Sequence, residues 1–352
     1  MADRRSVLVV DDSAYMRVVL KDMLEADPTL HVVSTAKDGL EAIDKVKKLH
    51  PDVVVLDIQM PKMDGLATLQ RIMRECPTRV VMLSAMDRVD PQLPLQALDL
   101  GAVDFISKPG GPVSVDIVIF GSRIVEIVRN SAEARVDALT RTRPPSPHKL
   151  HLAPPKPTRG VGRRAIVVAA STGGPKTLEA MFSALPRNIN IPIFIVQHLP
   201  EGFSESFAKR LTAARGPKVV LAVDGDEAKP GMAYLAPGDR HLVLEAGRTG
   251  AVTMRLQQTE PVNYVRPSAD VLFTSASKCF GANLLAVVLT GMGSDGARGA
   301  EAVKSAGGRV VVQDEASSVI FGMARAVVGR GAADKVLPME DIPLEIVSFM
   351  EG

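Results

Sequence analysis

The sequence predicts an α/β protein of two domains, each built on a mostly parallel sheet. The chain has 352 residues, which corresponds to about two domains at roughly 150 residues each. In both halves, short β-branched runs alternate with amphipathic stretches, which is typical of parallel sheets covered by helices. A stretch with six prolines over residues 141–160 separates the halves. We therefore expect domains over residues 1–130 and 163–352, joined by a flexible linker over 131–162.

The first domain is expected to hold five strand–helix units in succession. The strand candidates are short β-branched runs, and helical patterns separate them. They span residues 6–10, 31–35, 53–56, 79–83 and 103–106. Such a succession predicts one parallel sheet, with ligands bound at the carboxyl ends of its strands.

Polar side chains stand at those strand ends. Asp11 and Asp12 follow the first strand and Asp57 the third, while Ser84 and Lys108 follow the fourth and the fifth. Three carboxylates at one edge repel one another unless a cation joins them, and Mg²⁺ prefers such oxygen ligands. A carboxylate can also be the nucleophile toward a phosphoryl group, whose oxygens a lysine and a hydroxyl would then stabilise. The positions favour a phosphorylation site over isolated helix caps.

Four motifs of this half, VLVVDDS, VVVLDIQMPKMDG, VVMLSA and DFISKP, resemble the receiver domain of two-component response regulators. The similarity covers about residues 5–128 and implies a flavodoxin-like (βα)5 fold. It also implies Mg²⁺ at Asp11, Asp12 and Asp57, and phosphoryl transfer from a chemotaxis histidine kinase to Asp57. Ser84, Phe105 and Lys108 would form the switch that responds to phosphorylation of Asp57. Gln59 stands where the family more often has an acidic residue.

The second domain is expected to resume the alternation as a doubly wound, mostly parallel sheet. Its strand candidates span residues 165–169, 192–197, 284–289 and 309–313. Between Val219 and Leu256, short alternating runs punctuated by glycine and proline predict an antiparallel excursion of hairpins.

Three residues that could act together follow three of those strands. Ser171 lies at a glycine-rich strand-to-helix turn, His198 follows the run IPIFIVQ, and Asp295 lies in GMGSDG after the run LLAVVLT. They would supply a nucleophile, a base and an orienting carboxylate at one edge. The turn at Ser171 also fits an anion cradle, although neither a P-loop nor a GxSxG elbow is present. His241, by contrast, belongs to a polar hairpin.

The loop around Asp295 also supports a different class of function. Gly291, Gly293 and Gly296 fit the GxGxxG fingerprint of dinucleotide-binding folds, and Asp314 ends the next strand 18 residues later. A nucleotide-binding oxidoreductase is therefore an alternative. However, the fingerprint normally opens the first βαβ unit, whereas this one comes about 120 residues into its domain.

Four motifs of this half, VVAASTGGP, IVQHLPEGF, YLAPGDRHL and LTGMGSDGARG, resemble the catalytic domain of chemotaxis protein-glutamate methylesterases over about residues 163–350. The resemblance implies a triad of Ser171, His198 and Asp295, with the Met292 amide and the Thr172 hydroxyl as oxyanion donors. It implies hydrolysis of glutamate γ-methyl esters on chemoreceptors, without a cofactor for this step. The same site could deamidate receptor glutamines. The resemblance further implies that the unphosphorylated receiver covers the esterase site.

Composition and charge narrow the choice of partners. The net charge is +2, and no aromatic residues interleave the basic residues between positions 138 and 178, so we expect no nucleic acid partner. A response regulator with a binding-only output is disfavoured because no helix-turn-helix signature follows the linker. No apolar run reaches the roughly 18 residues of a membrane span, and no signal peptide precedes the first strand. The sequence therefore predicts a cytoplasmic enzyme, peripheral to membrane receptors.

Overall fold

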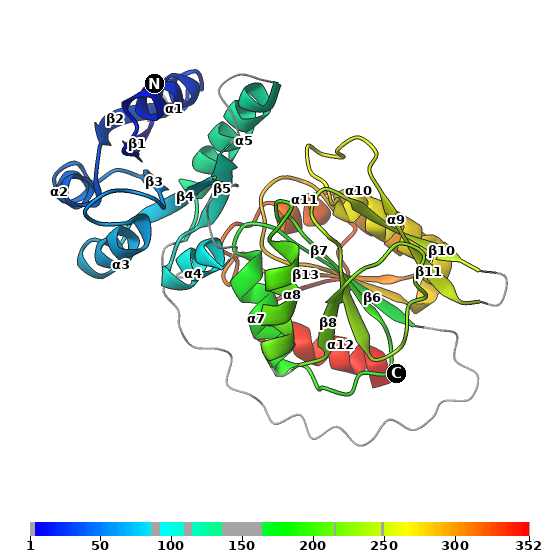
Figure 1. Ribbon diagram of the computed structural model, residues 1–352. Coiled ribbons are helices and arrows are strands. Elements are labelled where there is room, and N and C mark those ends of the chain that lie inside the picture. The colour runs from blue at the N-terminus through cyan, green and yellow to red at the C-terminus, as the bar shows by residue number, and fades with distance from the viewer. Residues whose placement is uncertain are drawn as a thin grey trace. The chain divides into compact units, whose positions relative to one another are not determined.

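The computed structural model describes residues 4–85, 92–108, 115–135, 164–214, 216–247 and 250–351. The chain divides into two compact units, Met1–Arg141 and Thr142–Gly352 (Figure 1). Beyond Arg135, the linker predicted over 131–162 lies outside the described residues. Ala132 and Ala134 are buried, and Arg79 Nε donates to the Ala134 carbonyl at 2.7 Å, so the packed part of the first unit reaches at least Ala134. The domain boundaries themselves stay a prediction.

The first unit is a parallel five-stranded sheet in the order β2-β1-β3-β4-β5. The five strands predicted here are all present, each end within two residues of its expected position. Helices α1 and α5 pack together, as do α2, α3 and α4 in sequence, so helices form two layers. The elements are β1 (Arg5–Val10), α1 (Ala14–Glu25), β2 (Leu30–Ala36), α2 (Gly39–Leu49), β3 (Val53–Asp57), α3 (Gly65–Glu75), β4 (Arg79–Ala85), α4 (Leu93–Leu100), β5 (Asp104–Lys108) and α5 (Val115–Ser131).

Local chemistry explains where these elements begin and end. Every residue of β3, VVVLD, is buried, as expected for a central strand covered by helices on both faces. Ser13, Asp38 and Asp64 cap α1, α2 and α3, each side chain accepting a hydrogen bond from a backbone N–H three residues later. The caps fix the start of each helix directly after the loops at the strand ends.

The second unit is a seven-stranded sheet in the order β14-β13-β12-β6-β7-β9-β8, with every strand pair parallel. Its elements are β6 (Ala165–Ala170), α7 (Gly174–Ala184), β7 (Ile193–Gln197), α8 (Ser204–Ala213), β8 (Lys218–Leu221), β9 (Met232–Leu235), β10 (His241–Ala246), β11 (Val252–Gln257), α9 (Ala269–Phe280), η1 (Gly281–Asn283), β12 (Leu284–Val288), α10 (Ala297–Ser305), β13 (Arg309–Gln313), α11 (Met323–Gly329), β14 (Lys335–Leu337) and α12 (Ile342–Glu351).

The antiparallel excursion is shorter than the sequence predicts. Strands β10 and β11 form the expected antiparallel hairpin, which packs on α9. Strands β8 and β9, predicted as part of the same excursion, instead join the main sheet in parallel. The glycines and prolines between them mark a turn, but they do not specify the direction of the strand that follows. Among the described residues, no helix is long and apolar enough to cross a membrane.

Both sheets reverse their strand order next to the first strand of the unit. In the first unit, β1 lies between β2 and β3, and in the second, β6 lies between β7 and β12. Loops at the carboxyl ends of two such strands leave the sheet on opposite faces and open a crevice, where ligands of parallel α/β proteins bind. The topology thus places Asp11, Asp12 and Asp57 at one crevice and the loops after β6 and β12 at the other.

Candidate functional site

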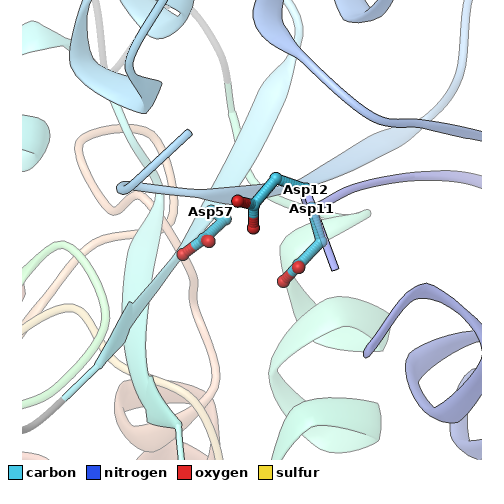
Figure 2. Close-up of side chains that lie close together, drawn as sticks. All are labelled: Asp11, Asp12 and Asp57. Atoms are coloured by element: carbon cyan, nitrogen blue, oxygen red, sulfur yellow. The ribbon is translucent and has the colours of Figure 1, made fainter. Parts of the chain in front are cut away.

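The first candidate site lies at the carboxyl ends of β1 and β3. Asp11 and Asp12 follow β1, Asp57 ends β3, and carboxylate oxygens of the three lie within 4.8 Å of one another. Figure 2 shows the three side chains close together. Asp11 is fully buried, Asp57 is 4% exposed and Asp12 is exposed to solvent. The acidic cluster is therefore buried on one side and open on the other.

Lys108 brings a positive charge to this cluster. Its Nζ lies 2.7 Å from Asp11 Oδ2 and 2.9 Å from Asp57 Oδ2. Burial raises the pKa of Asp57 to about 6; Lys108 opposes the rise, whereas the carboxylates of Asp11 and Asp12 add to it. One lysine does not neutralise three carboxylates, so their oxygens fit a further hard cation such as Mg²⁺.

Ser84 and Phe105 lie on the strands beside this cluster. The Ile58 N–H donates to the Leu83 carbonyl at 3.0 Å, which places Ser84 next to the strand end that carries Asp57. Ser84 is fully buried, and its Oγ has no hydrogen-bond partner in the described part of the chain. Phe105 is 3% exposed. A buried hydroxyl without a partner is costly, and a phosphoryl oxygen on Asp57 would satisfy it.

The second candidate site lies where β6, β7 and β12 end side by side. Ala170 pairs with Gln197, and the His198 N–H donates to the Ala170 carbonyl at 3.1 Å. On the other side, the Ser171 N–H donates to the Thr290 carbonyl at 3.0 Å. Ser171 therefore stands between the first residue after β7 and the loop after β12.

His198 and Asp295 form the central contact of this site. His198 Nε2 lies 2.8 Å from Asp295 Oδ2, and both side chains are almost completely buried. Because Nε2 faces the carboxylate, Nδ1 is the ring nitrogen left to take a proton from another group. The structure thus brings two of the predicted triad residues into contact and places the third, Ser171, on the adjacent strand end.

A dense set of donors surrounds Asp295. Burial by itself would raise the pKa of Asp295, but hydrogen bonds from His198, Ser268 and the Ala269 amide lower it to about 2. The carboxylate lies at the N-terminus of α9, where free N–H groups favour an anion. Its donors are Ser268 Oγ (2.6 Å), Asn263 Nδ2 (3.0 Å) and the Asp270 N–H (3.2 Å) on Oδ1, and the Ala269 N–H (2.6 Å) with His198 on Oδ2.

Ser268, Asn263 and His241 are site residues that the sequence patterns did not reveal. His241 starts β10 of the predicted hairpin but is fully buried. Its Nδ1 accepts from the Ser268 N–H at 3.1 Å, and its Nε2 lies 3.1 Å from the Glu260 carbonyl. Burial lowers the pKa of His241, which favours the neutral ring that these two contacts require. None of the three follows a parallel strand, so their positions gave no signal.

The glycines of the GxGxxG match have structural tasks of their own. A Cβ on Gly291 would lie 2.8 Å from Ser171 Cβ and would also meet the Met323 sulfur, so only glycine allows this approach. Gly296 has a φ of +89° directly before α10. Asp314, the candidate ribose ligand, accepts from the Ser317 N–H at 2.9 Å and from Ser317 Oγ at 2.6 Å. These contacts do not favour a dinucleotide site.

Two family models match the chain. The model described as CheB methylesterase matches residues 166–346, and the model described as response regulator receiver domain matches residues 7–117. The first covers most of the second unit and the second most of the first unit.

Several curated proteins resemble the chain over nearly its full length. A protein-glutamate methylesterase/protein-glutamine glutaminase of Thermotoga maritima is 41% identical over 98% of this chain and 98% of its own. A protein of the same name from Pyrococcus horikoshii is 40% identical over 100% of this chain and 95% of its own. Among solved structures, the CheB methylesterase catalytic domain of Thermotoga maritima is 42% identical, with a TM-score of 0.52; the match covers 53% of this chain and 99% of that domain.

Proposed function

The chain belongs to the CheB methylesterase family and carries a response regulator receiver domain, and on this premise we propose that it is a phosphorylation-activated serine esterase. It hydrolyses glutamate γ-methyl esters on chemoreceptors and releases methanol, as part of chemotactic adaptation. The glutaminase named in its relatives makes deamidation of receptor glutamines a second reaction of the same site. The observation that carries the proposal is the buried His198–Asp295 pair beside the strand end of Ser171.

Acyl transfer begins at Ser171. Asp295, whose pKa is about 2, is ionised and holds the proton of His198 on Nε2, which leaves Nδ1 as the base. Nδ1 takes the proton of the Ser171 hydroxyl while Oγ attacks the ester carbonyl. The C–O bond to the methoxy group then breaks, and His198 returns the proton to the leaving methanol. Water, deprotonated by His198, hydrolyses the acyl-serine to a free glutamate and restores Ser171.

The negative charge on the carbonyl oxygen needs donors close to Ser171. Met292 follows Gly291, whose backbone packs against Ser171, so the Met292 amide is our first oxyanion donor. The Thr172 hydroxyl is the second candidate. Removal of one such donor typically lowers the rate by about 10² to 10³.

Phosphorylation takes place at Asp57. A carboxylate oxygen of Asp57 attacks the phosphorus of a phosphohistidine on the chemotaxis kinase, the P–N bond breaks and an aspartyl phosphate forms. Mg²⁺ bound by Asp11, Asp12 and Asp57 would neutralise the carboxylates and the phosphoryl oxygens. Lys108 pairs with one phosphoryl oxygen, and the Ser84 hydroxyl, which has no partner among the described residues, donates to another. Phe105 is the third residue of the proposed phosphorylation switch, together with Ser84 and Lys108.

The phosphorylated first unit releases the esterase from inhibition. To raise the active fraction from 1% to 99%, phosphorylation has to stabilise the active state relative to the inhibited state by about 5.5 kcal/mol. The partners are the chemoreceptors as substrates and the histidine kinase as phosphodonor. We place the enzyme in the cytoplasm, without nucleic acid and in contact with membranes only through its receptors.

The test is methanol release from methylated chemoreceptors by the full-length chain. The samples are the wild type with and without Mg²⁺ plus acetyl phosphate, and the Ser171→Ala variant under both conditions. We expect release that rises with the phosphodonor and disappears in Ser171→Ala. Release that persists in Ser171→Ala would contradict the serine mechanism, and no release from the wild type with any methylated receptor would contradict the esterase function.

A further inference from the structure

The loop between β11 and α9 contains a tight turn in a costly conformation. Val262 and Val265 exchange two backbone hydrogen bonds of 3.1 Å, so the two residues between them close the turn. Asn263 has a φ of +53° and Tyr264 a φ of +63°. Asparagine tolerates this left-handed region, but a bulky tyrosine rarely occupies it. The backbone at Tyr264 is therefore held in place by its surroundings.

The turn is fastened to the catalytic carboxylate. Asn263 Nδ2 donates to Asp295 Oδ1 at 3.0 Å and to Asp270 Oδ2 at 2.8 Å. Asp295 in turn holds His198 at 2.8 Å through its other oxygen. Tyr264 is thus the chain neighbour of a residue that contacts the triad, and its backbone has a fixed position relative to the reacting groups.

The side chain of Tyr264 points away from the protein. It is 95% exposed, more than any other large apolar side chain in the described residues; the next is Tyr15 at 65%. A ring that is fully exposed contributes no burial to offset the unfavourable backbone. Strained backbone that no local packing explains is common at ligand-contacting sites, and tyrosine is enriched among residues that dominate protein interfaces.

We propose that Tyr264 is a substrate-recognition residue, which packs against the polypeptide that flanks the esterified glutamate. This inference rests on the proposed esterase function, because it assigns a contact to the same substrate. A tyrosine ring supplies a large contact area at a low conformational-entropy cost, since two side-chain angles fix it. The turn presents that ring rigidly, and the Asn263 amide sets its distance from His198 and Asp295. Tyr264 therefore aligns the protein substrate and takes no part in the bond changes.

The test compares Tyr264→Ala and Tyr264→Phe in the full-length chain, saturated with Mg²⁺ and acetyl phosphate. Methanol release is measured against the concentration of methylated receptor, and in parallel with a free amino-acid glutamate γ-methyl ester. We expect Tyr264→Ala to raise KM for the receptor about tenfold, with kcat within about twofold and the small ester unaffected. Tyr264→Phe, which keeps the ring, stays near the wild type. Val223→Ala is the matched control, because Val223 is another exposed apolar residue of the same unit (52%).

Several outcomes would overturn the proposal. An unchanged KM for the receptor in Tyr264→Ala, or an equal loss on the receptor and on the small ester, would exclude a contact with the flanking polypeptide. Higher activity of Tyr264→Ala without the phosphodonor, at unchanged KM, would mean that the ring serves inhibition by the first unit. If the wild type releases no methanol, the esterase function fails and this assignment with it, whereas an active wild type with an insensitive Tyr264 refutes this assignment alone.

Discussion

Asp57 and Asp295 are two buried aspartates beyond the carboxyl ends of strands in two parallel sheets, yet their pKa values are shifted in opposite directions. Both stand at the crevice where the strand order reverses, and they are 4% and 2% exposed. Burial raises the pKa of Asp57 to about 6, while the pKa of Asp295 is lowered to about 2 in spite of its burial. The difference lies in the donors: within the described residues, Asp295 accepts five hydrogen bonds, whereas Asp57 shares one lysine with another carboxylate.

The comparison suggests how a fold assigns two roles to one residue type. A carboxylate with all its lone pairs occupied is a fixed charge that orients another group and does not react. A carboxylate with few donors and like charges beside it is under-stabilised, and it gains from a cation and from bond formation with phosphorus. The same substitution in both positions should therefore have different consequences.

The largest expected effect is that of Asp295→Asn on methanol release. An amide cannot hold the Nε2 proton of His198 as a carboxylate does and offers the wrong partner to the surrounding donors, so we expect kcat to fall by about 10⁴. The measurement is the initial rate of the activated full-length chain with methylated receptor. Asp314→Asn is the control, because its carboxylate serves a turn in the same unit. A loss of less than tenfold in Asp295→Asn would mean that Asp295 does not orient the base.

Asp57→Asn should abolish stimulation and leave the basal rate unchanged. The variant has no carboxylate to accept a phosphoryl group, while the triad lies in the other unit. We expect the increase caused by Mg²⁺ and acetyl phosphate, up to about 100-fold, to disappear. Rates with and without the phosphodonor give the result directly, and equal stimulation of wild type and variant would refute Asp57 as the phosphorylated residue.

Asp57→Asn should also stabilise the protein when Mg²⁺ is absent. Since the folded pKa of about 6 lies above the unfolded value of 3.8, the wild type loses stability as the pH rises from about 4 to about 6. That loss amounts to at most about 3 kcal/mol at pH 7 and is absent below pH 3. Calorimetric unfolding at pH 3, 5 and 7 should show that the free energy of unfolding of the variant increases relative to that of the wild type as the pH rises. Mg²⁺ should reduce this difference in unfolding free energy at pH 7. A difference that is constant with pH would assign the stabilisation to another cause.

Ser268→Ala tests the set of donors around Asp295 and should have the smallest effect. It removes one hydrogen bond of 2.6 Å and leaves four donors on the carboxylate. We expect kcat to fall about tenfold, in line with one hydrogen bond to a charged group. Ser183→Ala, at an exposed serine on α7, is the control. A loss as large as that of Asp295→Asn would show that Ser268 has a role beyond orienting Asp295.

The sequence is most informative about candidate functional residues that come shortly after a predicted strand. The strand positions located Asp11, Asp12 and Asp57 together, because hydrophobic runs fix where a parallel strand stops and the next residue faces the crevice. The same logic singled out Ser171, His198 and Asp295. Their catalytic roles, like that of Asp57, stay predictions until the variants are measured.

The supporting residues could not be predicted in this way. Ser268 and Asn263 lie in PVNYVRPSAD, a stretch whose polar residues are typical of any loop, and they reach Asp295 only after the chain has folded back. The sequence places His241 in a polar hairpin, whereas its side chain is buried, because alternation reports the two faces of a strand and not what packs on them. The parallel direction of β8 and β9 was hidden for a similar reason, since turn residues do not encode strand direction.

Gly291 limits which substitutions the second candidate site can tolerate. Ser171, the proposed nucleophile, and the loop after β12 approach so closely that even a methyl group at position 291 would meet Ser171. Substitution by alanine, normally the mildest probe of a side chain, is here an insertion into a filled space. In a mutational scan, activity should therefore be about as sensitive to substitution at position 291 as at the proposed triad residues, although glycine contributes no functional group. For an engineer who wishes to change substrate preference, position 291 has to stay glycine as long as Ser171 and its surroundings are kept.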